Sequence, residues 1–338
     1  MNFRMSTVVV TAVLLAFSAP SVRAQQPAAP QAAPTTGTIA QVTPNLYRVI
    51  GPGFPTSTVF LVTPEGIILA DPLNPELSAW LKGELAARFP GKPVKWVIQS
   101  HFHYDHARGG GIFEDTATFV AQENMRKNLR APVLADAFGP GDSIDRNGDN
   151  KLDKSEAPGG AQRNFDRYDT DRDGFISADE LYADVHWPGV VFKDQYTITL
   201  GGQHAQLIWA KNRHTSDMLD VYFPEEKVLF AGDYVWFNRM CCGFDYDRRP
   251  MSTWIDSIKA LEALDFTTLV GSHYDPGTKA DMVAFRQWLE ELQAGVSAGI
   301  KAGKSLDELQ KTLKFEKYKS WQGYDMQLPG MIQSAYNS

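Results

Sequence analysis

The sequence predicts a layered α/β domain that is interrupted by an acidic insert, and three observations support this. Strand-like runs alternate with helical patterns in both halves of the 338-residue chain, which is typical of sheets covered by helices. Hydrophobic residues make up 43% of the chain and charged residues 22%, as in ordinary globular proteins. Between residues 142 and 185, by contrast, 12 Asp or Glu and six Lys or Arg give a net charge of −6.

The first 24 residues are typical of a secretory signal peptide. Arg4 supplies positive charge, Val8–Phe17 is a short apolar run, and Val22-Arg23-Ala24 places small residues where a signal peptidase reads. The apolar run is about half of the roughly 20 residues that a membrane span needs, so an uncleaved anchor is the less favoured alternative. We expect a periplasmic or secreted protein that has left the membrane after cleavage. Residues 25–37, rich in Gln, Pro and Ala, are expected to be a flexible linker.

The negative net charge of the chain limits the classes of partner that it is expected to bind. The formal net charge is −7, and it becomes −9 when Arg4 and Arg23 are removed with the signal peptide. Binding to nucleic acid requires basic surface, so this charge argues against such a partner. We therefore expect a small-molecule substrate, and the sequence leaves the oligomeric state open.

The two cysteines, Cys241 and Cys242, are adjacent in the sequence. Neighbouring Cα atoms lie about 3.8 Å apart, closer than the roughly 4.4–6.8 Å that is usual across a disulfide. Two unbridged thiols are therefore favoured over a strained bond, and neither cysteine fits a metal-ligand position.

The elements of the main domain, residues 38–338, are predicted in order along the chain. Thr58–Thr63 and Gly66–Ala70 are β-rich runs joined by a tight turn. A helix is predicted to begin at Pro75, because Asn74 before it is a favourable cap. Further strands are predicted at Val94–Ile98, Tyr196–Leu200, Ala205–Trp209, Leu219–Phe223, Val228–Ala231 and Thr268–Val270, and further helices at Thr253–Leu264 and Thr278–Leu292.

Three of the seven histidines lie in one hexapeptide, His101-Phe102-His103-Tyr104-Asp105-His106. Imidazole is a preferred ligand of zinc, and carboxylate is also accepted. His101 and His103 are two residues apart on extended chain, so their side chains point the same way. The backbone turn that follows can direct Asp105 and His106 toward a second point.

Three other candidate ligands, His214, Asp233 and His273, each follow a predicted strand. Open α/β sheets collect their binding sites beyond the ends of strands. We therefore expect these residues to complete a metal site with the hexapeptide. His186 and His204 lack this context and are assigned no role.

The pattern His101-x-His103-x-Asp105-His106, followed in this order and spacing by His214, Asp233 and His273, resembles the metallo-β-lactamase superfamily over about residues 40–290, the insert excepted. The resemblance implies a four-layer αβ/βα sandwich with two metal ions at one edge of two facing sheets. It also implies one zinc ion held by His101, His103 and His214, a second held by Asp105, His106 and His273, and Asp233 as the bridge.

Two zinc ions roughly 3.5–4 Å apart can share one water and bring its pKa near 7, so that a bridging hydroxide attacks a carbonyl or phosphoryl centre. Asp105 and Asp233 are the candidate catalytic carboxylates, which orient or relay the proton. An Asp at position 233 is similar to glyoxalase-II-like hydrolases and lactonases, whereas true β-lactamases usually carry Cys or Ser there.

We therefore expect an exported zinc-dependent hydrolase that acts on an ester, thioester, lactone or lactam carbonyl. A true β-lactamase that hydrolyses antibiotics is one alternative. A phosphodiesterase is another, although the acidic charge makes it less favourable. A non-enzymatic scaffold that binds calcium and zinc is the alternative from a different class, and it would not require an open dinuclear site.

The insert, residues 142–186, contains two matches to a 12-residue calcium-binding loop and resembles a pair of EF-hands. Leu152 and Ile176 occupy equivalent positions and are expected to pair the loops, and Phe165 and Tyr168 suit the helix that enters the second loop. Pro140-Gly141 disfavours an entering helix before the first. We expect two calcium ions, the alternative being solvated acidic loops without metal. The expected calcium-site residues are Asp145, Asn147, Asp149, Lys151, Asp153 and Glu156 in the first loop, and Asp169, Asp171, Asp173, Phe175, Ser177 and Glu180 in the second.

Overall fold

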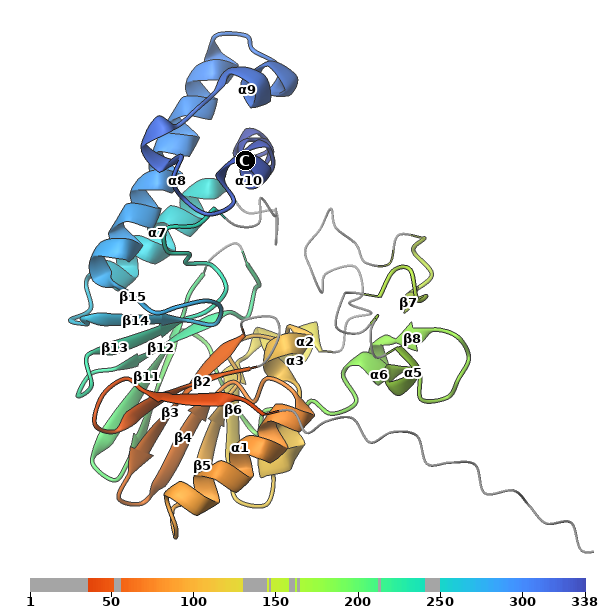
Figure 1. Cartoon of the computed structure of the whole chain (residues 1–338), viewed down its shortest axis with the longest axis vertical. Coiled ribbons are helices and arrows are strands. Elements are labelled where there is room, and N and C mark those ends of the chain that lie inside the picture. Colours follow the sequence, from red (N-terminus) through yellow and green to blue (C-terminus); the bar gives the residue numbers. More distant parts are fainter. Residues whose placement is uncertain are drawn as a thin grey trace, which may run out of the picture. The chain divides into compact units, whose positions relative to one another are not determined.

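Two sheets form the centre of the protein in this computed structural model, which describes residues 36–51, 56–129, 145, 147–157, 162, 165–211, 214–240 and 250–338 (Figure 1). The described residues belong to one unit, Thr35–Ser338. The first sheet has the order β1-β2-β3-β4-β5-β6-β9. Its strands are β1 Thr38–Gln41, β2 Leu46–Ile50, β3 Ser57–Thr63, β4 Gly66–Ala70, β5 Val94–Ile98, β6 Thr118–Gln122 and β9 Val190–Phe192.

The second sheet has the order β10-β11-β12-β13-β14-β15. Neighbouring strands are antiparallel except for the parallel pair β13–β14. Its strands are β10 Gln195–Leu200, β11 Gln203–Trp209, β12 Leu219–Phe223, β13 Val228–Ala231, β14 Thr268–Gly271 and β15 Gly277–Thr278.

Helices cover the outer face of each sheet. Seven α-helices lie in the described parts outside the insert: α1 Pro75–Arg88, α2 Tyr104–Ala107, α3 Asn124–Asn128, α7 Met251–Glu262, α8 Lys279–Lys301, α9 Leu306–Thr312 and α10 Tyr324–Tyr336. The short 3₁₀ turns η1 Gly110–Phe113 and η3 Glu316–Tyr318 lie there as well. In Figure 1, α1 lies against the first sheet, and α7 and α8 lie beside the second. No described helix has the length and apolar character needed to cross a membrane.

The alternation of side chains along the strands explains this layering. Val59 and Leu61 on β3 pack between the two sheets, against residues such as Val221, because side chains two apart point to the same face. Phe60, between them, faces the other way and packs with Leu77 of α1. On the far side of the second sheet, a third cluster joins it to α7 and α8. The predicted four-layer αβ/βα sandwich is therefore confirmed.

The last two helices, α9 and α10, were not predicted from the sequence, and the predicted helix before them ends later than expected. Helix α8 continues to Lys301, beyond the predicted end at Leu292, although two glycines lie in its second half. At Gly299 a Cβ atom would lie only 2.2 Å from Leu309 Cδ2, so the absence of a side chain lets α9 approach α8 closely. The tertiary contact outweighs the weak helix propensity of glycine, which costs about 1 kcal/mol relative to alanine.

The described part of the insert includes the short helices α5 Phe165–Tyr168 and α6 Ala178–Leu181 and a two-stranded sheet of β7 Lys151–Leu152 and β8 Ile176–Ser177. The predicted pairing of Leu152 with Ile176 is confirmed, and so is a helix at Phe165–Tyr168. The predicted signal peptide, most of the linker, Pro140-Gly141 and both cysteines lie outside the described residues.

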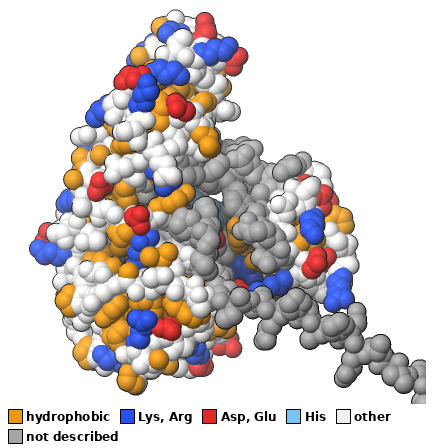
Figure 2. All heavy atoms as spheres, in the orientation of Figure 1, with side chains coloured by type: hydrophobic (Ala, Val, Ile, Leu, Met, Phe, Trp, Pro, Cys, Tyr) orange, Lys and Arg blue, Asp and Glu red, His pale blue; other side chains and the backbone are white. Residues whose placement is uncertain are grey.

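The described surface carries charges of both signs. Figure 2 shows Lys and Arg side chains interspersed with Asp and Glu over the described part of this face, with no continuous basic area there.

Candidate metal centre

The first group of candidate ligands consists of His101, His103, His214 and Asp233, each of which offers one ligand atom within 4.8 Å of the others. His101 and His103 follow β5, His214 lies before β12, and Asp233 follows β13. His214 Nε2 lies 3.3 Å from His101 Nε2 and 3.1 Å from His103 Nδ1. All four residues are buried, so the core of the fold fixes their positions.

The second group consists of Asp105, His106, Asp233 and His273, again within 4.8 Å of one another. His106 Nε2 lies 3.1 Å from Asp233 Oδ2 and 3.4 Å from Asp105 Oδ2. His273 Nε2 lies 3.1 Å from the same oxygen of Asp233. The structure thus brings together all seven residues that the sequence predicted as zinc ligands, and Asp233 is the residue that the two groups share.

The nitrogen atoms of the first group fit a metal cation. Burial lowers the pKa of His101 and His214 well below the usual range, and it lowers the pKa of His103 to about 4. These imidazoles are therefore neutral at physiological pH, which is the form that binds zinc. Neutral imidazole nitrogens that face one another at 3.1–3.3 Å match the donor set of a shared cation better than a network of hydrogen bonds.

The carboxylates of the centre are ionised. Burial alone would raise the pKa of Asp233, but His106 and His273 lower it well below its usual range. The pKa of Asp105 falls to about 2, because His106 and His273 outweigh the opposing effect of burial. Burial disfavours the charge on His106, yet Asp233 and Asp105 raise its pKa well above the usual value. Two ionised carboxylates thus supply the negative charge that two divalent ions require.

Asp71 is a residue of the centre that the sequence reasoning missed. It is completely buried, and its Oδ2 lies 3.1 Å from His106 Nδ1. The same carboxylate accepts hydrogen bonds from the backbone N–H and the hydroxyl of Ser100, and Ser100 Oγ in turn lies 3.0 Å from His101 Nδ1. A carboxylate that holds the second nitrogen of a ligating histidine fixes its tautomer and orientation. Its place in the sequence could have identified it, because Asp71 directly follows the predicted strand Gly66–Ala70.

The two histidines without an assigned role lie in other surroundings. The ring of His186 stacks on Phe119 at a centroid distance of 3.9 Å. His204 Nδ1 lies 2.6 Å from Glu225 Oε1 in an exposed pair. Neither residue belongs to a metal-ligand group among the described residues.

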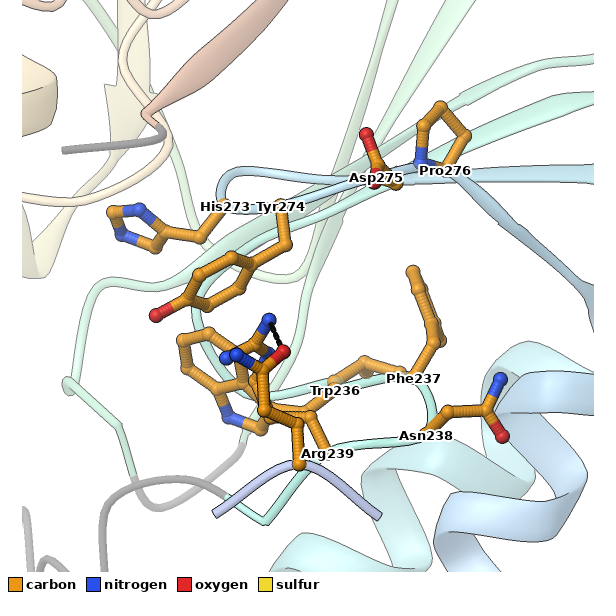
Figure 3. A pocket seen from close by; sticks show the side chains of 10 residues that line it. Trp236, Phe237, Asn238, Arg239, His273, Tyr274, Asp275 and Pro276 are labelled. Carbon is orange, nitrogen blue, oxygen red and sulfur yellow. Dashed lines mark hydrogen bonds between the residues drawn. The ribbon is translucent and has the colours of Figure 1, made fainter. Parts of the chain in front are cut away.

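A pocket of about 270 Å³ opens beside His273 (Figure 3). The ring of Trp236 stacks on His273 with an angle of 11° between the ring planes. The guanidinium carbon of Arg239 lies 3.6 Å from the centre of the Tyr274 ring, and Arg239 Nη2 donates a hydrogen bond to Gln322 Oε1. The remaining walls come from Val235, Phe237, Asn238, Asp275 and Pro276.

Gln322 reaches this pocket from the C-terminal part of the chain. It forms an isolated β-bridge with Arg239, and its backbone oxygen accepts a hydrogen bond from the N–H of Met240 at 2.9 Å. A wall of the pocket therefore depends on residues outside the two sheets.

In the second loop of the insert, Asp169, Asp171 and Glu180 each offer a carboxylate oxygen within 4.8 Å of the others. The described acidic residues of the first loop form no such group. Its third position is Asn147, and the carboxylate of Asp145 accepts hydrogen bonds from the N–H groups of Gly148, Asp149 and Asn150. The structure therefore brings together acidic residues of one of the two predicted calcium sites.

The comparisons with known proteins agree with the fold and the centre. The chain belongs to the metallo-beta-lactamase superfamily, whose sequence profile matches residues 51–273. It is accordingly a hydrolase of this superfamily with a candidate metal-binding His/Asp cluster. The predicted family is confirmed.

Three relatives illustrate the range of the family. The chain is 22% identical over 287 residues to the alpha subunit of 2,4-dinitroanisole O-demethylase from Nocardioides sp. (strain JS1661), which covers 83% of this chain and 69% of that subunit. The inverting sec-alkylsulfatase Pisa1 from Pseudomonas sp. superposes with a TM-score of 0.65 at 18% identity, covering 89% of this chain but only 50% of the sulfatase. A metallo-beta-lactamase from Pontibacter korlensis superposes with a TM-score of 0.53 at 18% identity, covering 75% of this chain and 99% of that one. The two structural likenesses show the fold alone.

Proposed function

We propose that this protein is a zinc-dependent hydrolase that cleaves an ester, thioester, lactone or lactam. The observation that supports this most directly is the convergence of seven His and Asp side chains in two groups that share Asp233. Bound there, two zinc ions would polarise a carbonyl group and lower the pKa of a water from 15.7 to about 7. The proposed ligands are His101, His103 and His214 for one ion, Asp105, His106 and His273 for the other, and Asp233 for both.

Asp105 and Asp233 are the proposed catalytic carboxylates. The side chain of Asp105 is 25% exposed, compared with 7% for Asp233, so Asp105 is the one that water and substrate reach. Because its pKa is about 2, Asp105 is ionised and accepts a hydrogen bond from the attacking water. Asp233 is buried between His106 and His273 and holds both of them in place.

The pocket beside His273 is the proposed substrate-binding site. Trp236 and Tyr274 offer apolar surface to its organic part. Stacking on Tyr274 and the hydrogen bond to Gln322 hold the guanidinium of Arg239 in one orientation. A preoriented guanidinium recognises planar anions, so the favoured substrates carry a negatively charged group close to the bond that is cleaved.

The test is a metal analysis combined with a panel of chromogenic carboxylic esters, thioesters, lactones and β-lactams, each assayed with and without zinc. We expect close to two zinc ions per chain and zinc-dependent cleavage of at least one carbonyl class. Cleavage confined to β-lactams would replace this proposal with a true β-lactamase. Bound zinc without any turnover would favour the scaffold.

Matched variants sharpen the test. His214→Ala is expected to lose zinc and activity, whereas His204→Ala, outside the centre, is expected to keep both. Arg239→Gln is expected to raise KM for anionic substrates and to leave neutral ones unchanged. An equal effect of Arg239→Gln on both kinds of substrate would contradict the proposed role of the pocket.

We also propose that the second loop of the insert, residues 169–180, binds calcium. Asp169 is only 8% exposed, and among the described residues its Oδ1 has no hydrogen-bond partner. A buried carboxylate oxygen without a partner is costly unless a cation or donor occupies the space beside it. Gly174, at φ +89°, provides the sharp turn of the loop. A calcium titration in the micromolar to millimolar range tests this site, and no saturable binding would contradict it.

Export to the periplasm or the medium is proposed from residues 1–24 alone. N-terminal sequencing of the protein recovered from its native host tests it, and the expected mature N-terminus is Gln25. Recovery of the chain with residues 1–24 attached would contradict cleavage.

A further inference from the structure

The segment His101–Ala107 carries four candidate zinc ligands, and its two aromatic residues belong to apolar clusters that include residues of the insert. Tyr104, which lies between His103 and Asp105, packs against the small apolar cluster of the insert, which includes Ile176 and Leu181. Phe102 belongs to a neighbouring cluster, where its ring lies 6.5 Å from that of Tyr182. The zinc-binding segment and the insert therefore share their packing.

Arg108, two residues beyond His106, provides a polar connection to the same insert. It is 8% exposed, and its Nε and Nη2 donate hydrogen bonds of 2.6 and 2.7 Å to the carboxylate of Asp184. Its Nη1 donates to the hydroxyl of Tyr168, and its guanidinium lies 4.4 Å from the centre of the Tyr168 ring. A partly buried bidentate pair of this kind has a defined geometry, so movement of Tyr168 or Asp184 is transmitted to Arg108.

These contacts fall at both ends of the proposed calcium loop. Tyr168 directly precedes Asp169, the first position of the loop, and Leu181 and Tyr182 directly follow Glu180, the last. A calcium ion held by Asp169 and Glu180 would fix the distance between the two ends. It would thereby fix the residues that contact Arg108 on one side and Phe102 and Tyr104 on the other.

We propose that calcium in the 169–180 loop and zinc in the His/Asp centre bind cooperatively, through Phe102, Tyr104 and Arg108. This inference rests on the proposed zinc and calcium sites. Calcium orders the residues of the insert that contact the segment His101–Ala107. Zinc then binds to ligands that are already in place. Linkage requires the effect to be reciprocal, so zinc must strengthen calcium binding by the same factor.

The experiment measures the complete cycle on the full mature protein. Zinc affinity is determined by competition with a zinc-selective chromogenic chelator, without calcium and at 1 mM calcium. Calcium affinity is determined by calorimetry, with and without zinc. We expect calcium to raise zinc affinity about tenfold, and zinc to raise calcium affinity by an equal factor, within the roughly 5–150-fold range of allosteric coupling.

Two variants locate the coupling. Glu180→Gln is expected to weaken calcium binding and to abolish the response of zinc affinity to calcium. Its control is Glu308→Gln, because Glu308 forms the same kind of capping box with Ser305 on α9 that Glu180 forms with Ser177 on α6. Arg108→Gln is expected to keep calcium binding and to reduce the coupling factor. The wild-type cycle requires no variant, so a folding defect does not prevent the test.

The outcomes separate this inference from the proposed function. Zinc binding that is indifferent to saturating calcium overturns the coupling and leaves the hydrolase proposal intact. Absence of saturable calcium binding overturns the proposed calcium site and the coupling, and it also leaves the hydrolase proposal intact. Failure to bind zinc under any condition overturns the proposed function, and the coupling with it.

Discussion

The His/Asp centre and the proposed calcium loop of the insert, residues 169–180, are built in opposite ways. The centre gathers mostly buried side chains from four places between His101 and His273, all held by the two sheets and their core. The loop takes its carboxylates from the 12 consecutive residues 169–180, and five buried apolar residues of the described part of the insert form the cluster beside it. A site assembled from distant residues is organised by the fold, whereas a local acidic loop with a small core depends on its ion for order.

The largest effect is expected from Asp233→Ala, since Asp233 belongs to both groups of the centre. Loss of the shared carboxylate should reduce the metal content from two ions toward one and lower kcat/KM by at least about a hundredfold, because several kcal/mol of transition-state stabilisation depend on the metals. Metal analysis and steady-state kinetics provide the measurement. Asp265→Ala, at an exposed ion pair with Lys227, is the control. Full metal content and activity in Asp233→Ala would refute the assignment of the centre.

Asp71→Asn tests how much the buried carboxylate that contacts His106 contributes to zinc affinity, compared with the proposed ligands themselves. The variant keeps the size of the side chain but loses the charge that faces His106 Nδ1. Zinc affinity should fall about 10–100-fold, the usual effect of removing an outer partner of a ligating histidine. Competition with a chelator measures it, and an unchanged affinity would reduce Asp71 to a purely structural role.

Calcium removal should act on the insert and leave the sheets nearly unchanged. At a hundredfold excess over Kd, a ligand that binds only the ordered form stabilises it by about 2.7 kcal/mol. Amide hydrogen exchange is therefore expected to accelerate in α5, β8 and α6 when calcium is withdrawn at constant zinc, while β12 and β13 keep their protection. Equal acceleration in both regions would contradict the view that the loop alone depends on calcium.

The smallest effect concerns two carboxylates whose pKa values shift in opposite directions. Burial raises the pKa of Asp220 to about 7, although Tyr234 donates a hydrogen bond to it. Burial would also raise the pKa of Glu180, but hydrogen bonds from Ser177 and Thr170 outweigh it and lower the pKa to about 2. Asp220 therefore costs stability as the pH rises from about 4 to 7, whereas Glu180 contributes stability that is lost as the pH falls from about 4.5 to 2.

Asp220→Asn should accordingly stabilise the protein at pH 8, by on the order of 1 kcal/mol, and give no gain at pH 4. Glu180→Gln should destabilise it at pH 7 and have little effect at pH 2. Denaturant unfolding at these pH values, with chelator present throughout so that metal loss does not differ between them, measures the free energy of unfolding. A gain from Asp220→Asn that is independent of pH would show that folding does not shift the pKa of Asp220.

The sequence predicted which residues the structure brings together in the centre, because each of them follows a strand and strand ends meet at one edge. It did not identify Asp71, whose role depends on a hydrogen bond to His106 that spans 35 residues. Strands β1, β2, β6, β9 and β15 were also missed. Strand β9 has only three residues and pairs with β6 across the whole insert. Arg239 carried no signal in the sequence, because its surroundings are provided by Tyr274 and Gln322.

The bridge between Arg239 and Gln322 has a consequence for engineering and for divergence among relatives. It places one wall of the pocket in the C-terminal part of the chain, beyond residue 273 where the family match ends. A segment that lines a pocket without belonging to the sheets can change in sequence while the metal ligands stay the same. Chimeras that exchange residues 302–338 between relatives would therefore combine one reactive centre with different substrate preferences.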